Sequence, residues 1–391
     1  MEPLRVLFMA TRDWYNPATT GGDNTMWENA RYLASRGHNV KFVAAAFPGA
    51  AHDASIDGIH VVRLGGIHSL WSRTLVYYLA NRGRYDVVVA EGFGGSRIPR
   101  LAPLYVKEPL VTEWHQVHRD LFEAQYPRVL LGPLNLLERV AVWVNRNTFV
   151  RAGTEEWRDA FVQVGFKPDK VFVLPVSIRD DWLTETKPNP VTEPNILWLG
   201  KIRRYKRPDH VIKAMPSVLK RVPGAHLTIA GRHDDVPYER RLQSLVDGQG
   251  LHEHVAFRFD LSEQEKRDLI RRSRVLVIPS AVEGFGIVAL EANACGVPVV
   301  ASSGVPQGAV SDGKNGLRYP SGDIGALADC ICAVLTDDSL YGRLSEGGRN
   351  FVSQFAWSKV GAQFEHVIED VVAMRRLKQS LKPDDSAAKV S

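Results

Sequence analysis

Short apolar runs rich in β-branched residues alternate with helical patterns along most of this 391-residue chain. Runs that are apolar almost throughout, and not only at every second position, are typical of parallel strands buried on both faces. We therefore expect an α/β fold with parallel sheets covered by helices. The runs are VLFMA (6–10), VKFVAAA (40–46), IHVVRL (59–64), DVVVAE (86–91), LVTEW (110–114), VFVLPV (171–176), ILWLG (196–200), HLTIAG (226–231), VAFRF (255–259), RVLVIPS (274–280) and VPVVAS (297–302).

A polar, proline-rich stretch, RDDWLTETKPNPVTEPN (179–195), separates these runs into two series. It has no apolar periodicity, which is typical of an interdomain linker, and the length of the chain also favours two domains. We expect a first domain over residues 1–180, a linker over 181–195, a second domain over 196–357, a helix over 358–377 that crosses back to the first domain, and a disordered tail over 378–391.

Composition narrows the possible partners. The formal charge of +5 and pI near 9.0 suit anionic partners, but no dense basic stripe with interleaved aromatic residues indicates nucleic-acid binding. No apolar run approaches the roughly 18 residues of a membrane span, and residues 1–10 predict a strand and not a signal peptide. The cysteines lack metal-ligand spacing, so we expect them to be buried thiols. Free thiols are typical of a reducing compartment, so we expect the protein to be cytoplasmic. The cysteines are Cys295, Cys330 and Cys332.

Loops that follow the strands are the places to search for a site, because ligands of open parallel sheets bind beyond the carboxyl ends of the strands. Two sheets facing each other would place a cleft between the domains. After the first strand, Gly21 and Gly22 precede a helix predicted from Asn24 to Arg36, where free N–H groups can face an anion. A glycine pair alone is more often a turn, and G-x-G-x-x-G is absent.

A second loop, LGKIRRYKRPDH, carries five cations within residues 201–207. A solvated basic loop would explain any one of them. For the cluster we favour a polyphosphate, which would relieve the repulsion between like charges. The cations are Lys201, Arg203, Arg204, Lys206 and Arg207.

A third loop, VEGFGIVALEANACGVPVVAS, places Glu283 before a glycine pair and Glu291 on the helix that follows. Carboxylates are rarely left in apolar surroundings without a partner or a chemical role. The start of this helix would suit a phosphate, and the two glutamates would suit the hydroxyls of a sugar. The alternative is that Glu291 pairs with a neighbouring arginine in the core.

Taken together, these motifs resemble the E-x7-E signature of retaining GT-B glycosyltransferases, family 4 or group 1. The similarity covers most of the chain, including SDGKNGLRYPSGD (311–323) and FAWSKV near its end. It implies two Rossmann-like domains, with Lys201 and Lys206 on the donor diphosphate, Glu283 near the transferred sugar and Glu291 on the ribose. The donor-binding set that it implies is Gly21, Gly22, Lys201, Arg203, Lys206, Gly231, Leu261, Gly284, Phe285, Gly286, Ile287 and Glu291.

His115, in VTEWHQVHRD, matches a histidine that the family often has at the sugar, and we predict a catalytic role for it with Glu283. An ordinary structural histidine is the alternative, and His118 stands three residues away. Two departures are visible. Lys201 stands where the family often has arginine, which replaces a bidentate fork by a point charge. Before the linker, LPVSIRD replaces the common Pro-Asn-Gly.

The resemblance predicts a retaining, metal-independent transfer of a sugar from a nucleotide sugar to a hydroxyl acceptor, with no cofactor. No D-x-D motif indicates a metal-bound diphosphate. The alternatives are a GT-B epimerase or phosphorylase, and an inactive GT-B binding protein. Apolar helices with arginines at 70–84 and 129–146 also suggest peripheral contact with the inner face of the plasma membrane and a lipid-linked acceptor. Simple packing of these helices on the sheet is the competing explanation.

Overall fold

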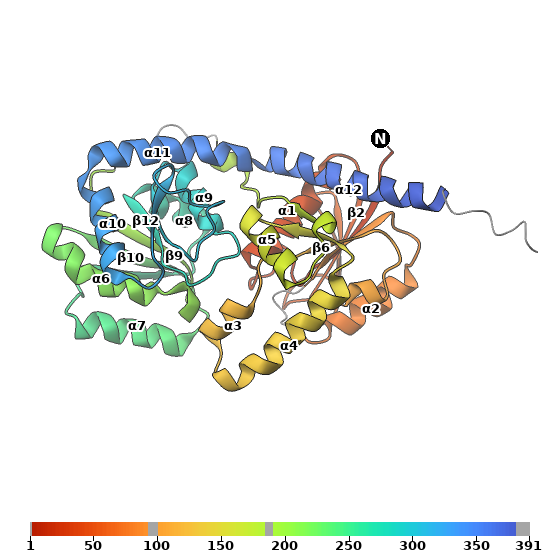
Figure 1. Cartoon of the computed structure of the whole chain (residues 1–391), viewed down its shortest axis with the longest axis horizontal. Coiled ribbons are helices and arrows are strands. Elements are labelled where there is room, and N and C mark those ends of the chain that lie inside the picture. The colour runs from red at the N-terminus through yellow and green to blue at the C-terminus, as the bar shows by residue number, and fades with distance from the viewer. Residues whose placement is uncertain (1, 93–100, 184–190, 381–391) are drawn as a thin grey trace, which may run out of the picture.

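The computed structural model describes residues 2–92, 101–183 and 191–380, which form two sheets of eight and six strands (Figure 1). The larger sheet belongs to the first half of the chain and the smaller sheet to the second half. Helices cover both sheets, and the predicted α/β class with two parallel sheets is confirmed. None of the helices in these described ranges is both long enough and apolar enough to cross a bilayer.

The first sheet has eight strands, β1 (Arg5–Met9), β2 (Asn39–Ala44), β3 (Asp53–Ile56), β4 (Ile59–Arg63), β5 (Val87–Glu91), β6 (Leu110–Glu113), β7 (Phe149–Ala152) and β8 (Val171–Val173). Their order is β3-β4-β2-β1-β5-β6-β7-β8, and only the pair of β3 and β4 is antiparallel among these described strands. The helical elements are α1 (Gly21–Ser35), α2 (Leu70–Ala80), η1 (Ala102–Leu104), α3 (Arg119–Gln125), α4 (Arg128–Asn145), α5 (Glu155–Val164), η2 (Pro168–Lys170) and η3 (Asp180–Trp182).

Strand β1 explains why its sequence is apolar throughout. Val6 and Phe8 face the core under α1, whereas Leu7 and Met9 face the opposite core, which contains Tyr78 of α2. Because successive side chains of a strand point to opposite faces, a strand covered on both sides needs an apolar residue at every position.

Helix α1 begins earlier than predicted. Gly21 and Gly22 form its first turn and not a loop before it, because Thr20 caps the helix and exchanges hydrogen bonds with Asp23. This reciprocal capping box satisfies backbone N–H groups that the helix start would otherwise leave free.

The second sheet has six strands, β9 (Asn195–Lys201), β10 (His226–Arg232), β11 (Val255–Phe259), β12 (Val275–Ile278), β13 (Val299–Ser302) and β14 (Gly316–Tyr319). Their order is β11-β10-β9-β12-β13-β14, and all their pairs are parallel. The central position of β9 and β12 brings the loops that follow them side by side. The helical elements are η4 (Arg204–Lys206), α6 (Pro208–Arg221), α7 (Val236–Gly248), α8 (Glu263–Arg271), α9 (Ile287–Ala294), α10 (Ile324–Thr336), α11 (Asp338–Val352), η5 (Ser353–Phe355) and α12 (Trp357–Ser380).

Helix α12 follows the second domain in sequence but packs on the first sheet (Figure 1). Phe364 and Ile368 lie in the core beneath α1, and the Trp357 indole donates to the Glu28 carbonyl at 3.0 Å. The chain therefore passes between the domains twice. The two passages are hydrogen-bonded to each other, since the Ile178 amide donates to the Phe355 carbonyl at 2.8 Å and the Ile178 carbonyl accepts from the Trp357 amide at 2.9 Å.

Two predicted segments lie partly outside the described residues. Within the predicted linker 181–195, residues 184–190 are outside, while η3 ends at Trp182 and β9 begins at Asn195. Of the tail predicted over 378–391, residues 381–391 are outside, and α12 continues to Ser380.

Candidate active site

Glu283 lies in the loop that joins β12 to α9, and its carboxylate is held from two sides. Lys206 Nζ donates to Glu283 Oε1 at 2.6 Å, and Ser280 Oγ donates to the same oxygen at 2.7 Å. Lys206 comes from η4, after the neighbouring strand β9. Burial lowers the pKa of Lys206, but the charge and hydrogen bond of Glu283, together with Tyr205, outweigh burial, so the pKa lies above the usual lysine value and the ammonium stays charged. The structure thus joins two residues that the sequence assigned to separate parts of a donor.

Glu291 lies on α9 and is also paired with a lysine. Lys266 Nζ of α8 donates to Glu291 Oε1 at 2.9 Å and lies 5.3 Å from the ring centroid of Trp182. Burial raises the pKa of Glu291, and Lys266 opposes that rise. The core-pairing alternative is therefore correct in kind, but the partner is a lysine and not an arginine. Lys266 was missed as a contact of Glu291, because only the fold brings α8 beside α9.

The expected basic loop binds the first domain. Lys201 Nζ donates to the Ala18 carbonyl at 3.2 Å, and Arg232 at the end of β10 donates to the Pro17 carbonyl at 3.0 Å. Burial lowers the pKa of Lys201 to about 8, and the positive charge of Arg203 adds to the effect. Arg203 forms a close ion pair with Asp234. The charge of Lys201 is therefore less compensated than the charge of Arg203.

His115 follows β6 and lies against the other domain. A Cβ atom on Gly22 would lie 2.4 Å from His115 Nε2, so a side chain at this position would displace the imidazole. A Cβ on Gly284 would lie 3.1 Å from the His115 carbonyl oxygen. Nε2 is buried and has no hydrogen-bond partner among the described residues. Burial lowers the pKa of His115, which favours a neutral imidazole, although Glu113 opposes the effect.

Of the remaining candidates, some lie around the start of α9 and the others have packing roles. Gly21 approaches Ile287, since a Cβ on Gly21 would lie 2.9 Å from Ile287 Cδ1, and Phe285 and Gly286 lead directly into α9. Gly231 has a φ of +148°, and a Cβ there would lie 1.7 Å from the Gly200 carbonyl oxygen, so close strand packing already requires glycine. Leu261 packs on the apolar core below α9.

Two expected alternatives are structural. Ser262 and Glu265 form the capping box of α8, with both reciprocal hydrogen bonds present. His118 hydrogen-bonds Glu138 through its backbone amide at 2.7 Å and through Nδ1 at 3.1 Å. The sequence had ranked His118 below His115, and its pairing with a buried carboxylate agrees with that order.

Buried ion pairs lie at the carboxyl ends of the first sheet, where the sequence predicts none. Glu113 accepts from Arg151 at 2.7 Å, and Asp13 accepts from Arg63 at 2.7 Å, with all four side chains buried. Arg151 lies on β7 and Glu113 on β6, whereas Arg63 lies on β4 and Asp13 follows β1. Because the partners are far apart in the sequence, no local spacing could reveal the pairs.

Asp23 is a further buried acid beside these pairs. Arg12 Nη1 lies 3.5 Å from Asp23 Oδ2. Burial raises the pKa of Asp23 to about 6, and the Glu91 carboxylate adds to the rise. This acid of the first turn of α1 therefore keeps its proton to a higher pH than an ordinary aspartate does.

One group of possible metal ligands lies elsewhere. Side chains of His38, Glu365 and Glu369 come close enough to share an ion. His38 already accepts the Leu4 amide through Nδ1 and hydrogen-bonds Glu365 through Nε2, so its ring has no nitrogen left for a metal.

Two models of known protein families match the chain. The model described as "Glycosyl transferase 4-like domain" matches residues 20–177, and the model described as "Glycosyl transferases group 1" matches residues 182–351. Together they cover every site residue predicted from the sequence and all strands of the two sheets except β1, which precedes the first match.

Three similar proteins carry related names. The chain is 28% identical over 299 residues to a D-inositol 3-phosphate glycosyltransferase of Xylanimonas cellulosilytica, which covers 72% of this chain and 71% of that protein. It is 32% identical over 185 residues to a GDP-mannose-dependent alpha-(1-6)-phosphatidylinositol monomannoside mannosyltransferase of Mycolicibacterium smegmatis, which covers 45% of this chain. It is 35% identical over 182 residues to a phosphatidyl-myo-inositol mannosyltransferase of Mycobacterium leprae, which covers 45% of this chain and 46% of that protein. For the Mycolicibacterium smegmatis protein the matched share is 47%, so this match spans about half of its length.

Solved structures share the fold. Sucrose-phosphate synthase from Thermosynechococcus elongatus superposes with a TM-score of 0.77 at 19% identity, covering 95% of this chain and 100% of that chain. These likenesses establish the two-sheet GT-B architecture, and the two family models establish the kind of enzyme. The chain belongs to the glycosyltransferases of group 1, family 4.

Proposed function

We propose that this enzyme transfers a sugar from a nucleotide-diphosphate donor to a hydroxyl acceptor, with retention of configuration and without a metal ion. The observation that carries the proposal is the 2.6 Å contact between Lys206 and Glu283 directly before α9. A cation, a carboxylate and a helix start adjoin there, which suits a diphosphate next to a sugar.

The diphosphate would be held by protein charges. Lys206 stays charged, and Lys201 would regain full charge when an anion neutralises its surroundings. Preorganised cations of this kind stabilise a leaving group that gains negative charge in the transition state. The acceptor would attack from the face that the diphosphate leaves, with a phosphate oxygen taking the proton.

His115 would orient the sugar. Its buried Nε2 has no partner among the described residues, and its neutral ring can donate or accept one hydrogen bond. Glu283 and the backbone amides near Phe285 would contact other hydroxyls of the same sugar. Both family models describe glycosyl transferases, which favours transfer over the epimerase, phosphorylase and inactive alternatives.

A donor assay tests this proposal. The protein is incubated with UDP-glucose and with GDP-mannose in the presence of EDTA, and release of nucleoside diphosphate is measured. We expect slow hydrolysis of one donor, with the first free sugar formed in the α configuration, as proton NMR can show. A first-formed β sugar would overturn retention, and activity that requires an added divalent ion would overturn metal independence.

We also propose that the acceptor is a polyol that carries a phosphate, in some cases linked to lipid. The similar proteins are named for D-inositol 3-phosphate and for a phosphatidylinositol monomannoside, which share this chemistry. Transfer to inositol phosphate and to phosphatidylinositol in detergent, compared with unphosphorylated inositol, tests it. Equal transfer to unphosphorylated inositol would contradict a role for the phosphate.

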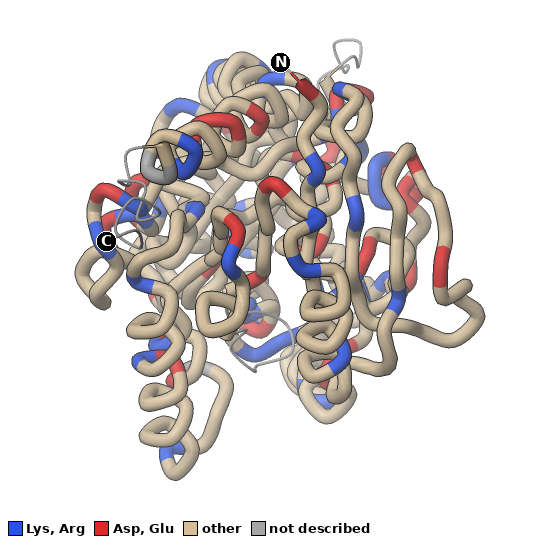
Figure 2. Tube along the Cα trace, turned by 90° about the vertical axis from the view of Figure 1, so that its right-hand side faces the viewer, with Lys and Arg blue, Asp and Glu red and all other residues tan. Residues whose placement is uncertain are grey.

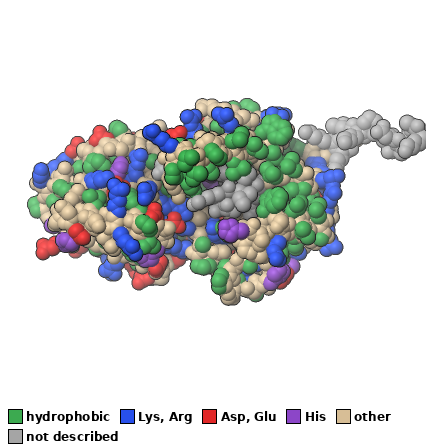
Figure 3. Space-filling view, turned by 90° about the horizontal axis from the view of Figure 1, so that it is seen from below, with side chains coloured by type: hydrophobic (Ala, Val, Ile, Leu, Met, Phe, Trp, Pro, Cys, Tyr) green, Lys and Arg blue, Asp and Glu red, His purple; other side chains and the backbone are tan. Residues whose placement is uncertain are grey.

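The outward faces of α4 and α2 support a lipid-linked acceptor. On α4, Val129 is 80% exposed, Leu136 63% and Trp143 62%. Val76 and Leu79 of α2 are also exposed. Figure 3 shows hydrophobic side chains gathered over the first domain on the lower face. Several large apolar side chains in one exposed region mark an interaction site.

The charge of this face favours an anionic bilayer over another protein surface. Arg128 and Arg139 of α4 and Arg73 of α2 are exposed, while Glu138, the acid of α4, is buried. Neither helix thus exposes an acidic residue among those that the structure describes. Apolar side chains flanked by arginines suit the interface of a leaflet that contains anionic lipids.

Vesicle flotation tests membrane contact. We expect binding to phosphatidylglycerol-containing vesicles at low salt, weaker binding at high salt, and a loss of binding in Leu136→Gln/Trp143→Gln. The control Val236→Gln/Leu377→Gln removes two apolar side chains that are also exposed but lie on α7 and α12. An equal loss in the control, or no binding by the unaltered protein, would leave only a soluble acceptor.

A further inference from the structure

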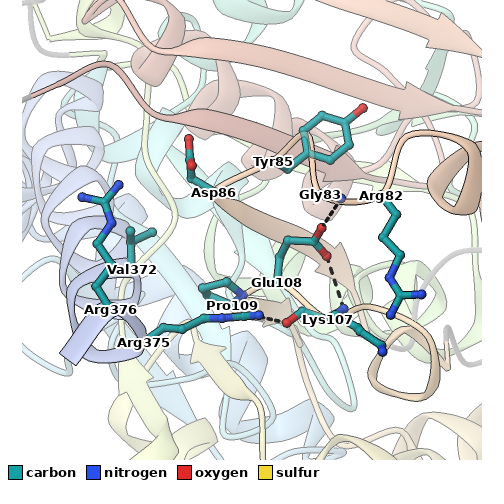
Figure 4. A pocket seen from close by; sticks show the side chains of 10 residues that line it. All are labelled: Arg82, Gly83, Tyr85, Asp86, Lys107, Glu108, Pro109, Val372, Arg375 and Arg376. Atoms are coloured by element: carbon teal, nitrogen blue, oxygen red, sulfur yellow. Dashed lines mark hydrogen bonds between the residues drawn. The ribbon is translucent and has the colours of Figure 1, made fainter. Parts of the chain in front are cut away.

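A cavity of about 310 Å³ lies at the edge of the first sheet where β5 and β6 begin. Four cations from three separate segments line it (Figure 4). Arg82 follows α2, Lys107 precedes β6, and Arg375 and Arg376 lie near the end of α12. The candidate active site is at the opposite edge, beyond the carboxyl ends of the strands, so the two sites are separate.

The two carboxylates of this cavity are already engaged by other donors. Asp86 accepts from the guanidinium of Arg5 at 2.9 and 3.1 Å and from the Arg5 amide at 2.8 Å. Glu108 accepts from the Tyr78 hydroxyl and from the backbone amides of Gly83 and Lys107. These contacts fix the walls of the cavity and leave its carboxylates little capacity for additional cations.

The lining cations are therefore only weakly compensated within the cavity, where Arg5, by its hydrogen bond, lowers the pKa of the Asp86 carboxyl and Arg376 lies near enough to help lower it. Among the described residues, the side chains of Arg82, Lys107 and Arg376 have no carboxylate within ion-pair distance. Arg375 donates one guanidinium N–H to the Lys107 carbonyl, which is uncharged. Figure 2 faces the end of the molecule where α12 finishes and shows Lys and Arg positions on several neighbouring segments.

We propose that this cavity binds a phosphate monoester, either as a free metabolite or as the headgroup of a phospholipid. Arginine presents paired N–H groups that match two oxygens of a phosphate, and three cations without an ion-pair partner among the described residues suit a dianion better than a carboxylate. A phosphate bound here would link α12 to the loops before β5 and β6, because its ligands come from all three segments.

Hydrogen exchange measured by mass spectrometry gives a local test. The full-length protein is compared in sodium phosphate and in sodium chloride at equal ionic strength. We expect slower exchange in residues 82–86, 105–110 and 370–377 with phosphate. The variant Arg82→Gln/Arg376→Gln is expected to lose this protection. Its control is Arg240→Gln/Arg241→Gln, which removes two exposed arginines from α7.

Two further arms distinguish the sources of the phosphate. Glycerol 3-phosphate represents a free monoester, and phosphatidylcholine vesicles with and without phosphatidic acid represent the headgroup. Protection by either supports the site and identifies its source. No protection by any phosphate, unchanged protection in Arg82→Gln/Arg376→Gln, or an equal loss in the α7 control would overturn it. If the double variant fails to fold, Lys107→Gln replaces it, since this side chain is exposed.

Discussion

Two buried carboxylates of the first domain and two of the second are held in different ways. In the first domain, Glu113 and Asp13 pair with arginines, and all four side chains are at most 4% exposed. In the second domain, Glu283 and Glu291 pair with Lys206 and Lys266, whose side chains are 20% and 19% exposed. Arginine makes fixed, planar contacts, whereas a lysine ammonium on a flexible stem can change partners. We infer that the arginine pairs support the fold and that the lysine pairs can yield to a ligand.

Breaking an arginine pair should have the largest effect on stability. Arg151→Met leaves Glu113 buried without its cation, which we expect to lower the free energy of unfolding by about 3–5 kcal/mol. Urea denaturation measures this change. Arg158→Met removes an exposed arginine that pairs with Asp159, and should cost less than about 1 kcal/mol. Equal losses would show that the buried pair has no special structural role.

Breaking a lysine pair should affect turnover more than stability. Lys206→Ala is expected to lower kcat about 10²-fold and to raise the donor KM, because the cation matters most as the leaving group gains charge. Its unfolding free energy should fall less than that of Arg151→Met. The control Lys213→Ala removes an exposed lysine paired with Asp209 on α6. Wild-type kcat and donor KM in Lys206→Ala would refute the assignment.

The two glutamates should differ from each other. Glu283→Gln is expected mainly to lower kcat, and Glu291→Gln mainly to raise the donor KM, each by about tenfold. Contacts to the transferring sugar change in the transition state, whereas contacts to a ribose do not. Initial rates over a range of donor concentrations separate the two. Identical changes in KM for both variants, with kcat unaltered, would remove the distinction.

The smallest expected effect is on the number of protons taken up when the donor binds. Lys201 has a pKa of about 8 in the free protein, lowered from 10.5. A bound diphosphate would raise this pKa, so donor binding between pH 8 and 10 takes up as much as one proton, and affinity falls as the pH rises through 8. Calorimetry in buffers of different ionisation enthalpy measures the uptake. Lys201→Arg should remove it, because arginine stays charged.

Strands buried on both faces were predictable, and the short mixed ones were not. β1, β9 and β12 have long apolar runs, because each packs against helices on two sides. β7 (FVRA) contains Arg151, which is tolerated in the interior only because Glu113 on β6 neutralises it. β14 and β3 are short and contain polar residues at partly exposed positions, so neither shows a clear strand pattern.

A similar division holds for the candidate site. The positions of Glu283 and Lys206 were predictable, because both follow central strands of one parallel sheet. Their direct contact was not, and neither was the contact of Lys201 with the Ala18 carbonyl. Such pairs depend on how far two loops approach each other across the fold, which no spacing along the chain encodes.

The paired passages between the domains have a mechanical consequence. Ile178 lies on one passage and Ala356 on the other, and the two form a parallel β-bridge. Two interdomain segments that are hydrogen-bonded side by side define a single axis between the domains. The two segments would permit rotation of one domain about that axis and would resist sliding or twisting of one domain against the other. A protease that cut the first passage would leave the halves attached, because α12 would still anchor the second half to the first.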